Sequence, residues 1–312
     1  MYLSCLLINV GDDPDRHRPG RLWLRNRYHV HQRLCMAFPS DPRKKRDPEF
    51  LIPYDQDDFP EQRHLADRKK NEVEYDALKQ VHSPRNDEAG FLFRIDPLCN
   101  GRVMIIVQSA IEPDWDYAFH NADYLLAAPP EVKSFDPVFS KGQRLRFRLL
   151  ANPTQKKATL PKRRWNTMSQ EEQNKEKTRH GKRVPVPSSQ EIDDWRGKHQ
   201  GEDPRTFVYE KLHEWLANWR LMRNGRTIDS AGFAIDPNFT IVQPGYVYIN
   251  KEGKGQGKRL HSARYEGILT VDDPELFKET LIRGIGSGKA FGFGLLSVAP
   301  AKASGEGGRT CE

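Results

Sequence analysis

The sequence predicts an α+β protein in which one order of elements, β-α-β-β-α-β, occurs twice along 312 residues. Three observations lead to this prediction. Strand-like and helix-like hydrophobic patterns follow this order in residues 2–132, the same order returns in residues 143–299, and one charged stretch with little periodicity interrupts each copy. Because this is the order of a ferredoxin-like unit, we expect two tandem ferredoxin-like domains. We place the boundary near residue 138, so that the domains are 1–138 and 139–312.

The first unit begins with a strand and an amphipathic helix. Residues 2–10 are apolar enough for a strand that is covered on both faces, and charged loop material follows them. In residues 26–38, apolar side chains recur at helical spacing from Val30 to Phe38 and form one stripe. Pro39 then ends the helix. This stripe predicts the face of the helix that packs on the sheet.

A charged insertion separates this helix from the rest of the first unit. Residues 41–90 contain 10 basic and 13 acidic residues with little periodicity, and we expect one surface helix there, near residues 61–80. A hairpin with a turn at Cys99-Asn100-Gly101, a short helix and a last strand complete the unit, over residues 91–97, 102–110, 112–119 and 124–132.

The second unit begins with a strand whose two faces differ in chemistry. In residues 143–153 apolar and basic side chains alternate, so one face carries Leu145, Phe147 and Leu149 and the other carries Arg144, Arg146 and Arg148. A basic stretch that is poor in apolar residues follows up to residue 183, and we expect it to be mobile. The unit is completed by helices at 193–198 and 207–222, strands at 241–250 and 265–273, a helix at 275–284 and a strand at 291–299.

Positive charge is concentrated in one part of the chain. The formal net charge is +7, but residues 140–183 hold 14 lysines and arginines against three glutamates, a local charge of +11, so the remainder sums to −4. A basic segment on an otherwise mildly acidic protein favours a polyanionic partner. A solvated loop that its lysines keep soluble is the alternative.

The sequence contains no pattern typical of a metal site, a disulfide framework or a membrane span. Its four cysteines are scattered without a CxxC pair, which predicts a reducing compartment. No basic segment precedes the N-terminal apolar run, and no apolar run approaches the roughly 20 residues of a membrane helix. We therefore expect a cytoplasmic protein that uses no metal and no cofactor.

A glycine-rich stretch, GIGSGKAFGFGLL at residues 284–296, fails the two nucleotide-binding patterns that we tested. A P-loop needs a glycine and a hydroxyl residue at two positions where this chain has Arg283 and Ala290. The dinucleotide fingerprint needs a third glycine where this chain has Lys289, and it joins a strand to a helix rather than a helix to a strand. Two interpretations stay open: backbone N–H groups laid along phosphates, or a tight turn that needs positive φ angles.

Together with its surroundings, GIGSGKAFGFGLLSVAP resembles the C-terminal glycine-rich signature of the repeat-associated RNA-binding proteins of CRISPR systems. MYLS, YHVH, EPDW, GQRLRFRLLANP, GKRV and YEGIL occur in the order of the CasE family, the endoribonuclease subunit of type I-E Cascade, and span almost the whole chain. The resemblance implies two ferredoxin-like domains and metal-independent cleavage of a CRISPR repeat hairpin, with the product retained. The partners it implies are this RNA hairpin and other Cascade subunits. The chain looks longer than typical members in residues 41–90 and 154–230.

Metal-independent cleavage by the RNA 2′-OH needs an aligned nucleophile, a stabilised phosphorane charge and a protonated leaving oxygen, and histidine suits the proton transfer. His31 and Tyr28 border the apolar stripe of the first helix, whereas His29 lies nearly opposite it with Met36. A catalytic side chain should flank the buried stripe, where packing fixes its rotamer. The Tyr-x-x-His pattern of the family selects the same pair. We predict that His31 transfers the proton and that Tyr28 binds the scissile phosphate or orients the nucleophile; an ordinary half-buried histidine is the alternative.

We expect several cationic segments of the chain to bind the phosphates of the RNA hairpin and so to clamp its stem. Related sequences often carry basic residues on the helical turn after the histidine, where this chain has Gln32 and Met36, so Arg27, Arg33 or the pair Lys182-Arg183 would supply that charge. A solvated charged edge strand is the alternative for each segment taken singly. A non-catalytic RNA-binding subunit is the alternative function. The predicted RNA-binding residues are Arg27, Arg33, Arg144, Arg146, Arg148, Lys182, Arg183, Lys258, Arg259, Gly286, Gly288 and Lys289.

Overall fold

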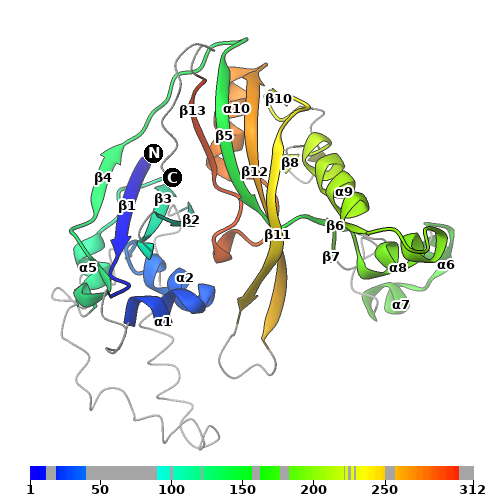
Figure 1. The fold of residues 1–312 in the computed structure, drawn as a ribbon, viewed down its shortest axis with the longest axis horizontal. Coiled ribbons are helices and arrows are strands. Elements are labelled where there is room, and N and C mark those ends of the chain that lie inside the picture. Colours follow the sequence, from blue (N-terminus) through cyan, green and yellow to red (C-terminus); the bar gives the residue numbers. More distant parts are fainter. Residues whose placement is uncertain are drawn as a thin grey trace, which may run out of the picture.

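The computed structural model of the protein describes residues 1–11, 19–39, 90–98, 101–120, 122–156, 162–175, 183–220, 222–223, 226–227, 230–249 and 257–301. Within these residues the chain forms two main antiparallel sheets, one from each half of the sequence, which stand side by side (Figure 1). Each sheet has its own cluster of buried apolar side chains.

The first half forms a four-stranded sheet with the order β2-β3-β1-β4, in which every neighbouring pair is antiparallel. Val30 and Leu34 of the second helix and Trp115 of α5 pack with Leu6 and Phe93 of the sheet in one buried cluster. The elements are β1 (Tyr2–Ile8), α1 (Pro19–Arg25), α2 (Arg27–Cys35), β2 (Phe91–Pro97), β3 (Val103–Ser109), α5 (Trp115–Phe119), the 3₁₀ helix η3 (Asp123–Leu125) and β4 (Glu131–Ser134).

The second half forms a five-stranded sheet around β5 and the long strand β12. Its order is β10-β12-β5-β13, and β11 pairs with another segment of β12. The elements are β5 (Arg144–Ala151), β6 (Thr154–Lys156), α6 (Lys162–Thr167), α7 (Gln170–Lys175), β7 (Arg183–Pro185), α8 (Ser189–Lys198), α9 (Arg205–Ala217), β8 (Met222–Arg223), β9 (Arg226–Thr227), β10 (Phe233–Ile235), β11 (Thr240–Ile249), β12 (Lys258–Val271), α10 (Pro274–Arg283), the 3₁₀ helix η4 (Lys289–Phe291) and β13 (Leu296–Pro300).

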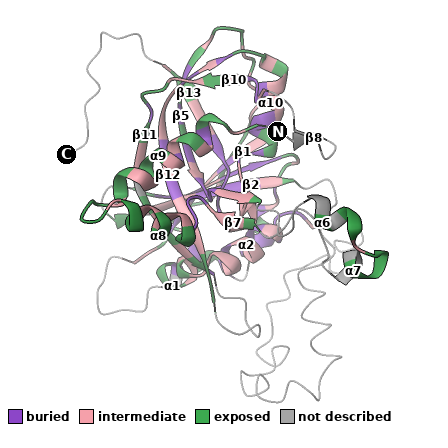
Figure 2. Ribbon diagram, turned by 90° about the vertical axis from the view of Figure 1, so that its right-hand side faces the viewer, coloured by how far each residue is buried: buried purple, intermediate pink, exposed green. Residues whose placement is uncertain are grey.

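The expected fold class, two tandem ferredoxin-like units, is confirmed. In each half the first strand lies inside the sheet and pairs with the last strand; its other neighbour is β3 in the first half and β12 in the second. Figure 2 shows buried residues concentrated on the strands of the two sheets, whereas α8 has none. The domain boundary near residue 138 stays a prediction; it falls in the segment between β4 and β5.

Two expectations for the first half were wrong. Helix α1 lies where charged loop material was expected, and its Trp23 and Leu24 pack against the first core. The strand expected at 124–132 begins only at Glu131, because the two prolines before it cannot donate backbone hydrogen bonds to a neighbouring strand. The surface helix expected near residues 61–80 lies outside the described residues.

Several expectations for the second half also need correction. The basic stretch 154–183 contains a paired strand, β6 with β7, and two short helices in its described parts. The helix expected at 193–198 starts at Ser189, where Ser188 and Glu191 form a reciprocal capping box. The last strand starts at Leu296 rather than at residue 291, because Gly292 and Gly294 have φ angles of +80° and +89°, outside the range of a strand.

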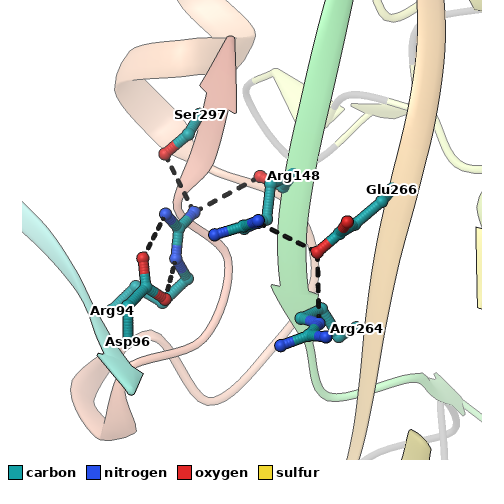
Figure 3. A network of polar contacts seen from close by, with 6 residues as sticks. All are labelled: Arg94, Asp96, Arg148, Arg264, Glu266 and Ser297. Carbon is teal, nitrogen blue, oxygen red and sulfur yellow. Dashed lines mark hydrogen bonds and ion pairs between the residues drawn. The ribbon is translucent and has the colours of Figure 1, made fainter. Parts of the chain in front are cut away.

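A buried ion pair joins the two sheets (Figure 3). The Arg94 side chain on β2 donates from Nε and Nη2 to the two carboxylate oxygens of Asp96, at 2.7 Å each. Its Nη1 crosses to the second half and donates to Ser297 Oγ at 2.8 Å and to the Arg148 carbonyl at 3.4 Å. A buried charge of this kind is stable only when its hydrogen bonds are satisfied. Arg94 therefore links the edge strand of the first sheet to β13 and β5.

The glycine-rich loop between α10 and β13 also packs against the first half. A β-carbon on Gly284 would lie 2.6 Å from Leu92 Cδ1, and one on Gly292 would lie 3.0 Å from both Phe93 Cε2 and Arg27 Nη1. Both glycines have positive φ, +71° and +80°. The turn interpretation of this loop is therefore observed: glycine is needed there for backbone conformation and for close approach to the first sheet.

Removing the carboxylate of Asp96 should weaken the junction between the sheets. Asp96→Ala leaves Arg94 as a buried charge without its partner, and we expect the free energy of unfolding to fall by about 3–5 kcal/mol in urea titrations. Arg196→Ala is the control, since it breaks an exposed ion pair with Asp193 and should cost about 1 kcal/mol or less. Equal losses in the two variants would contradict a structural role for the buried pair.

Gly292→Ala should destabilise the protein more than Gly142→Ala. The two glycines have almost the same φ, +80° and +81°, but a β-carbon at 142 would meet no atom within 4 Å, whereas one at 292 would meet Arg27 and Phe93. Both variants carry the backbone strain of about 1–2 kcal/mol, and only Gly292→Ala adds the steric clash. The melting temperatures of the two variants measure the difference. Identical melting temperatures would show that the loop can shift to accommodate the β-carbon at position 292 without a loss of stability.

Candidate active site

Helix α2 is placed at the junction of the two halves. Asn26 caps it, because its side-chain oxygen accepts a hydrogen bond from the Tyr28 backbone at 3.1 Å. Val30 and Leu34 are fully buried and fix the face that packs on the first sheet. Helix α2 also contacts η4 of the glycine-rich loop and strand β11, and none of its residues is exposed.

The His31 ring is half-buried and held by neighbours on two sides. It stacks on Phe91 at a centroid distance of 5.6 Å and on Phe93 at 6.5 Å, with interplanar angles of 28° and 15°. The Cys35 sulfur, one turn later on the same helix, lies 3.6 Å from Nε2 and 3.9 Å from Nδ1. These contacts restrict the orientation of the imidazole, as proton transfer at a defined position requires.

Tyr28 lies one turn before His31 on α2 and is also half-buried. Its ring centroid is 6.4 Å from that of His29, the histidine that we did not select. One part of the helical projection was wrong: Met36, expected opposite the core, is 8% exposed. The helix ends at Cys35, so Met36, Ala37 and Phe38 leave the helical spiral and turn into the core.

Arg27 brings a positive charge to the same face of α2, four residues before His31. Its Nη1 is buried, has no hydrogen-bond partner among the described residues, and lies against Gly292. Burial lowers the pKa of Arg27 to about 10, and the carboxylate of Asp96 opposes this shift. The guanidinium therefore stays charged at neutral pH, in a site where an unpaired charged donor is costly.

Arg33, the other candidate on this helix, has a structural contact. Its Nη1 donates to the carbonyl of Ala118 in α5 at 3.0 Å. Of the two arginines, Arg27 is thus the one that borders the glycine-rich loop.

The cation of the glycine-rich loop is engaged within the second half. The Lys289 ammonium donates to the carbonyl of Arg283 at the end of α10, and burial, followed by the charge of Arg283, lowers the pKa of Lys289. Gly286 packs against the Trp215 ring, and Gly288 lies beside Phe293 and Asn152. RNA binding by Gly286, Gly288 and Lys289 stays a prediction.

The arginine face of β5 is exposed, as the alternation predicted. Arg144 lies 3.8 Å from Asp236, and Arg148 lies 2.9 Å from Glu266, which also pairs with Arg264 (Figure 3). Arg146 has no ion pair with any acidic side chain of the described residues. Within the part of the chain that the structure describes, this face therefore offers one cation without an ion pair and two that are paired with carboxylates.

The remaining predicted cations lie on other strands. Arg183 on β7 donates to Thr154 Oγ1 at 3.3 Å, and Lys182 lies outside the described residues. Lys258 and Arg259 begin β12, where both are exposed.

The sequence analysis did not predict the neighbours of His31. Phe91 and Phe93 come from a strand distant in sequence, but Cys35, four residues along the same helix, could have been found by its spacing.

Among the described residues, no cluster of three or more His, Cys, Asp or Glu side chains could hold a metal ion. In the same part of the chain, no helix has the length and apolar character needed to cross a membrane.

Comparisons with known proteins identify the family. A family model described as CRISPR associated protein matches residues 75–300. The CRISPR-associated endoribonuclease Cse3 of Thermus thermophilus is 33% identical over 201 residues, which is 63% of this chain and 73% of that protein. A structure of Cse3 bound to a 19-nucleotide RNA matches with a TM-score of 0.53 and 25% identity, covering 96% of this chain and 98% of that one. Thermus thermophilus Cse3 bound to an RNA that represents a pre-cleavage complex matches with a TM-score of 0.53, 24% identity and the same coverage. This chain therefore belongs to the CRISPR-associated protein family, as a member of its CasE (Cse3) group.

Proposed function

We propose that this protein is an endoribonuclease that binds the hairpin of CRISPR repeat RNA, cleaves the precursor transcript and keeps the product as a Cascade subunit. The observation that carries the proposal is the His31 imidazole, which Phe91, Phe93 and Cys35 hold in a restricted orientation, four residues from the charged Arg27, on the helix that contacts the glycine-rich loop and β11. Membership of the CasE group supports RNA processing, because its Thermus relative is an endoribonuclease and RNA-bound structures of Cse3 share this fold.

The proposed reaction needs no metal. The 2′-OH attacks the adjacent phosphorus in line and gives its proton to water, the bond from phosphorus to the 5′ oxygen breaks, and the products are a 2′,3′-cyclic phosphate and a 5′-hydroxyl. His31 donates the proton that the 5′ oxygen takes up. Tyr28 donates a hydrogen bond to the scissile phosphate or orients the 2′-OH. The restricted imidazole supports this assignment, because a proton donor must reach one defined oxygen.

Arg27 is the residue that we assign to the developing phosphorane charge. Its Nη1 lacks a hydrogen-bond acceptor within the described residues, and a non-bridging phosphate oxygen supplies one in the proposed complex. A charged donor in a site of low dielectric stabilises a transition state more than an exposed one does. Arg33, tied to the carbonyl of Ala118, is less suited to this role.

The exposed cations grip the RNA stem in this proposal. Arg146 is unpaired within the described residues, and Arg183 and Lys258 are exposed on other strands. Guanidinium and ammonium groups on strands suit a stem whose base edges lie in a deep, narrow groove. The alternative, a non-catalytic RNA-binding subunit, uses the same cations but gives Tyr28 and His31 no chemical task.

His31→Ala should abolish most cleavage of a repeat transcript and leave hairpin affinity nearly unchanged. Loss of proton transfer typically costs about 10²- to 10⁴-fold in rate, whereas the stem contacts lie elsewhere. Single-turnover cleavage of labelled RNA and a binding titration measure the two quantities, with EDTA expected to have no effect. His29→Ala, on the same helix, is the matched control and should cleave normally. Full cleavage by His31→Ala would refute the assignment and favour the non-catalytic alternative.

Arg27→Ala should lower the single-turnover rate by about 10²- to 10³-fold, as the loss of one transition-state donor does elsewhere. Arg27→Lys should recover part of the rate, because an ammonium keeps the charge but not the fork geometry. Arg25→Ala removes an exposed charge from the neighbouring helix α1 and should have little effect. If Arg27→Ala and Arg25→Ala cleaved equally well, Arg27 would have no part in the chemistry.

A further inference from the structure

A second surface stands out on the hairpin arm formed by β11 and the start of β12. Tyr246 and Tyr248, two residues apart, share one face of β11, and their cross-strand partners on β12 are His261 and Arg259. The two tyrosines are 48% and 65% exposed, which is high for large aromatic side chains. We call these four residues the tyrosine face.

The tyrosine face combines oriented cations with open rings. The Arg259 guanidinium lies over the Tyr246 ring at 4.2 Å from its centroid, and the His261 ring meets Tyr246 edge-on at 4.8 Å. Tyr248 has no ring neighbour among the described residues. Burial and the charge of Arg259 lower the pKa of His261, so its imidazole is neutral at neutral pH. Arg259 is therefore the positive group of this face.

The tyrosine face is separate from the candidate active site. Side chains alternate along β11, so Val247 and Ile249 point to the other side of the arm, and Ile249 is only 4% exposed. Strand β11 contacts α2, which carries His31. The arm thus buries Ile249 on one face and presents the tyrosines on the opposite face.

The chemistry of this face fits unpaired nucleotides. Tyrosine rings and an arginine plane stack on the flat faces of bases, and the guanidinium also binds the phosphate that follows. Bases in a stem are already stacked on each other, so only single-stranded segments expose these faces. Exposed tyrosines with a nearby arginine are also common where proteins dock. Arg259 already lies over the Tyr246 ring, and RNA is the substrate of the family. Both points favour RNA over a protein as the partner of this face.

We propose that the tyrosine face binds one or two unpaired nucleotides that flank the RNA stem, with Tyr248 as the stacking platform and Arg259 on the adjoining phosphate. This inference rests on the proposed function, since it assumes that repeat RNA is the substrate. It assigns the arm a task that the clamp on the stem does not cover: recognition of the single strand next to the stem.

The test compares two RNAs taken from the repeat array beside the gene, the stem-loop alone and the stem-loop with its single-stranded flanks. Both carry a 2′-deoxy nucleotide at the cleavage position, so that binding is measured without cleavage. Wild-type protein should bind the flanked RNA more tightly. Tyr248→Ala should reduce that affinity by about 5- to 100-fold, the range for loss of one base–aromatic stack, and should leave the bare stem-loop unaffected.

Two further variants make the test specific. Tyr248→Phe keeps the ring and should retain the affinity for the flanked RNA. Tyr124→Ala changes another exposed tyrosine, in η3, and should bind both RNAs like the wild type. A 2-aminopurine base in the flank should be quenched by the wild type and not by Tyr248→Ala, and this readout does not depend on stability.

The outcomes separate the two proposals. If flanks add no affinity, or if Tyr248→Ala loses affinity equally for both RNAs, the tyrosine face does not bind unpaired nucleotides, while binding and cleavage of the stem-loop still support the proposed function. Unchanged RNA binding together with loss of a co-purifying Cascade subunit would make this face a protein-docking surface and would also overturn the inference. If wild-type protein bound neither RNA, the proposed function itself would fail.

Discussion

The candidate active site lies where the two halves of the chain touch. Its geometry therefore depends on the contacts that fix the position of one half relative to the other. The bidentate pair of Arg94 and Asp96 places a buried charge on the edge strand of the first sheet, and its third nitrogen reaches Ser297 in the second. Gln108 adds a second link, donating to the Leu281 carbonyl in α10 at 2.9 Å. Polar links between two apolar cores define one relative position better than apolar packing alone, because a shifted arrangement leaves buried donors unsatisfied.

The glycine-rich loop follows from the same constraint. Within the 12 residues between α10 and β13 it must pass the first sheet at contact distance, and its backbone adopts conformations that side chains disfavour. Its glycines thereby let the guanidinium of Arg27 approach the second half. Asp96, which binds Arg94, also offsets part of the burial cost of Arg27, so one carboxylate supports both the junction and the candidate site.

Sequence patterns predicted the features that depend on residues close to one another in the chain. The alternation in β5 and the stripe on α2 are set by neighbours in sequence, and the structure agrees with both. The predicted position of Met36 was wrong because the helix ends at Cys35 and the residues that follow, Ala37 and Phe38, pack in the core. The contact of Arg27 with Gly292 and the stacking of His31 on Phe91 join distant segments, and no local pattern encodes them. The glycine loop illustrates the limit: a turn with positive φ angles was one of the two interpretations of the sequence, but no pattern indicated the sheet that the loop approaches.

Retention of a product constrains how an RNA-processing enzyme distributes its contacts. Interactions that are equal before and after cleavage hold substrate and product alike, and do not speed the reaction, whereas those made only in the transition state do. In the proposed complex the stem cations and the tyrosine face belong to the first kind, and His31 and Arg27 belong to the second. The two kinds of contact come from different elements, since the tyrosine face belongs to β11 and β12, whereas His31 and Arg27 belong to α2. A protein that remains with its product therefore has reason to bind the RNA with residues other than those that carry out the chemistry.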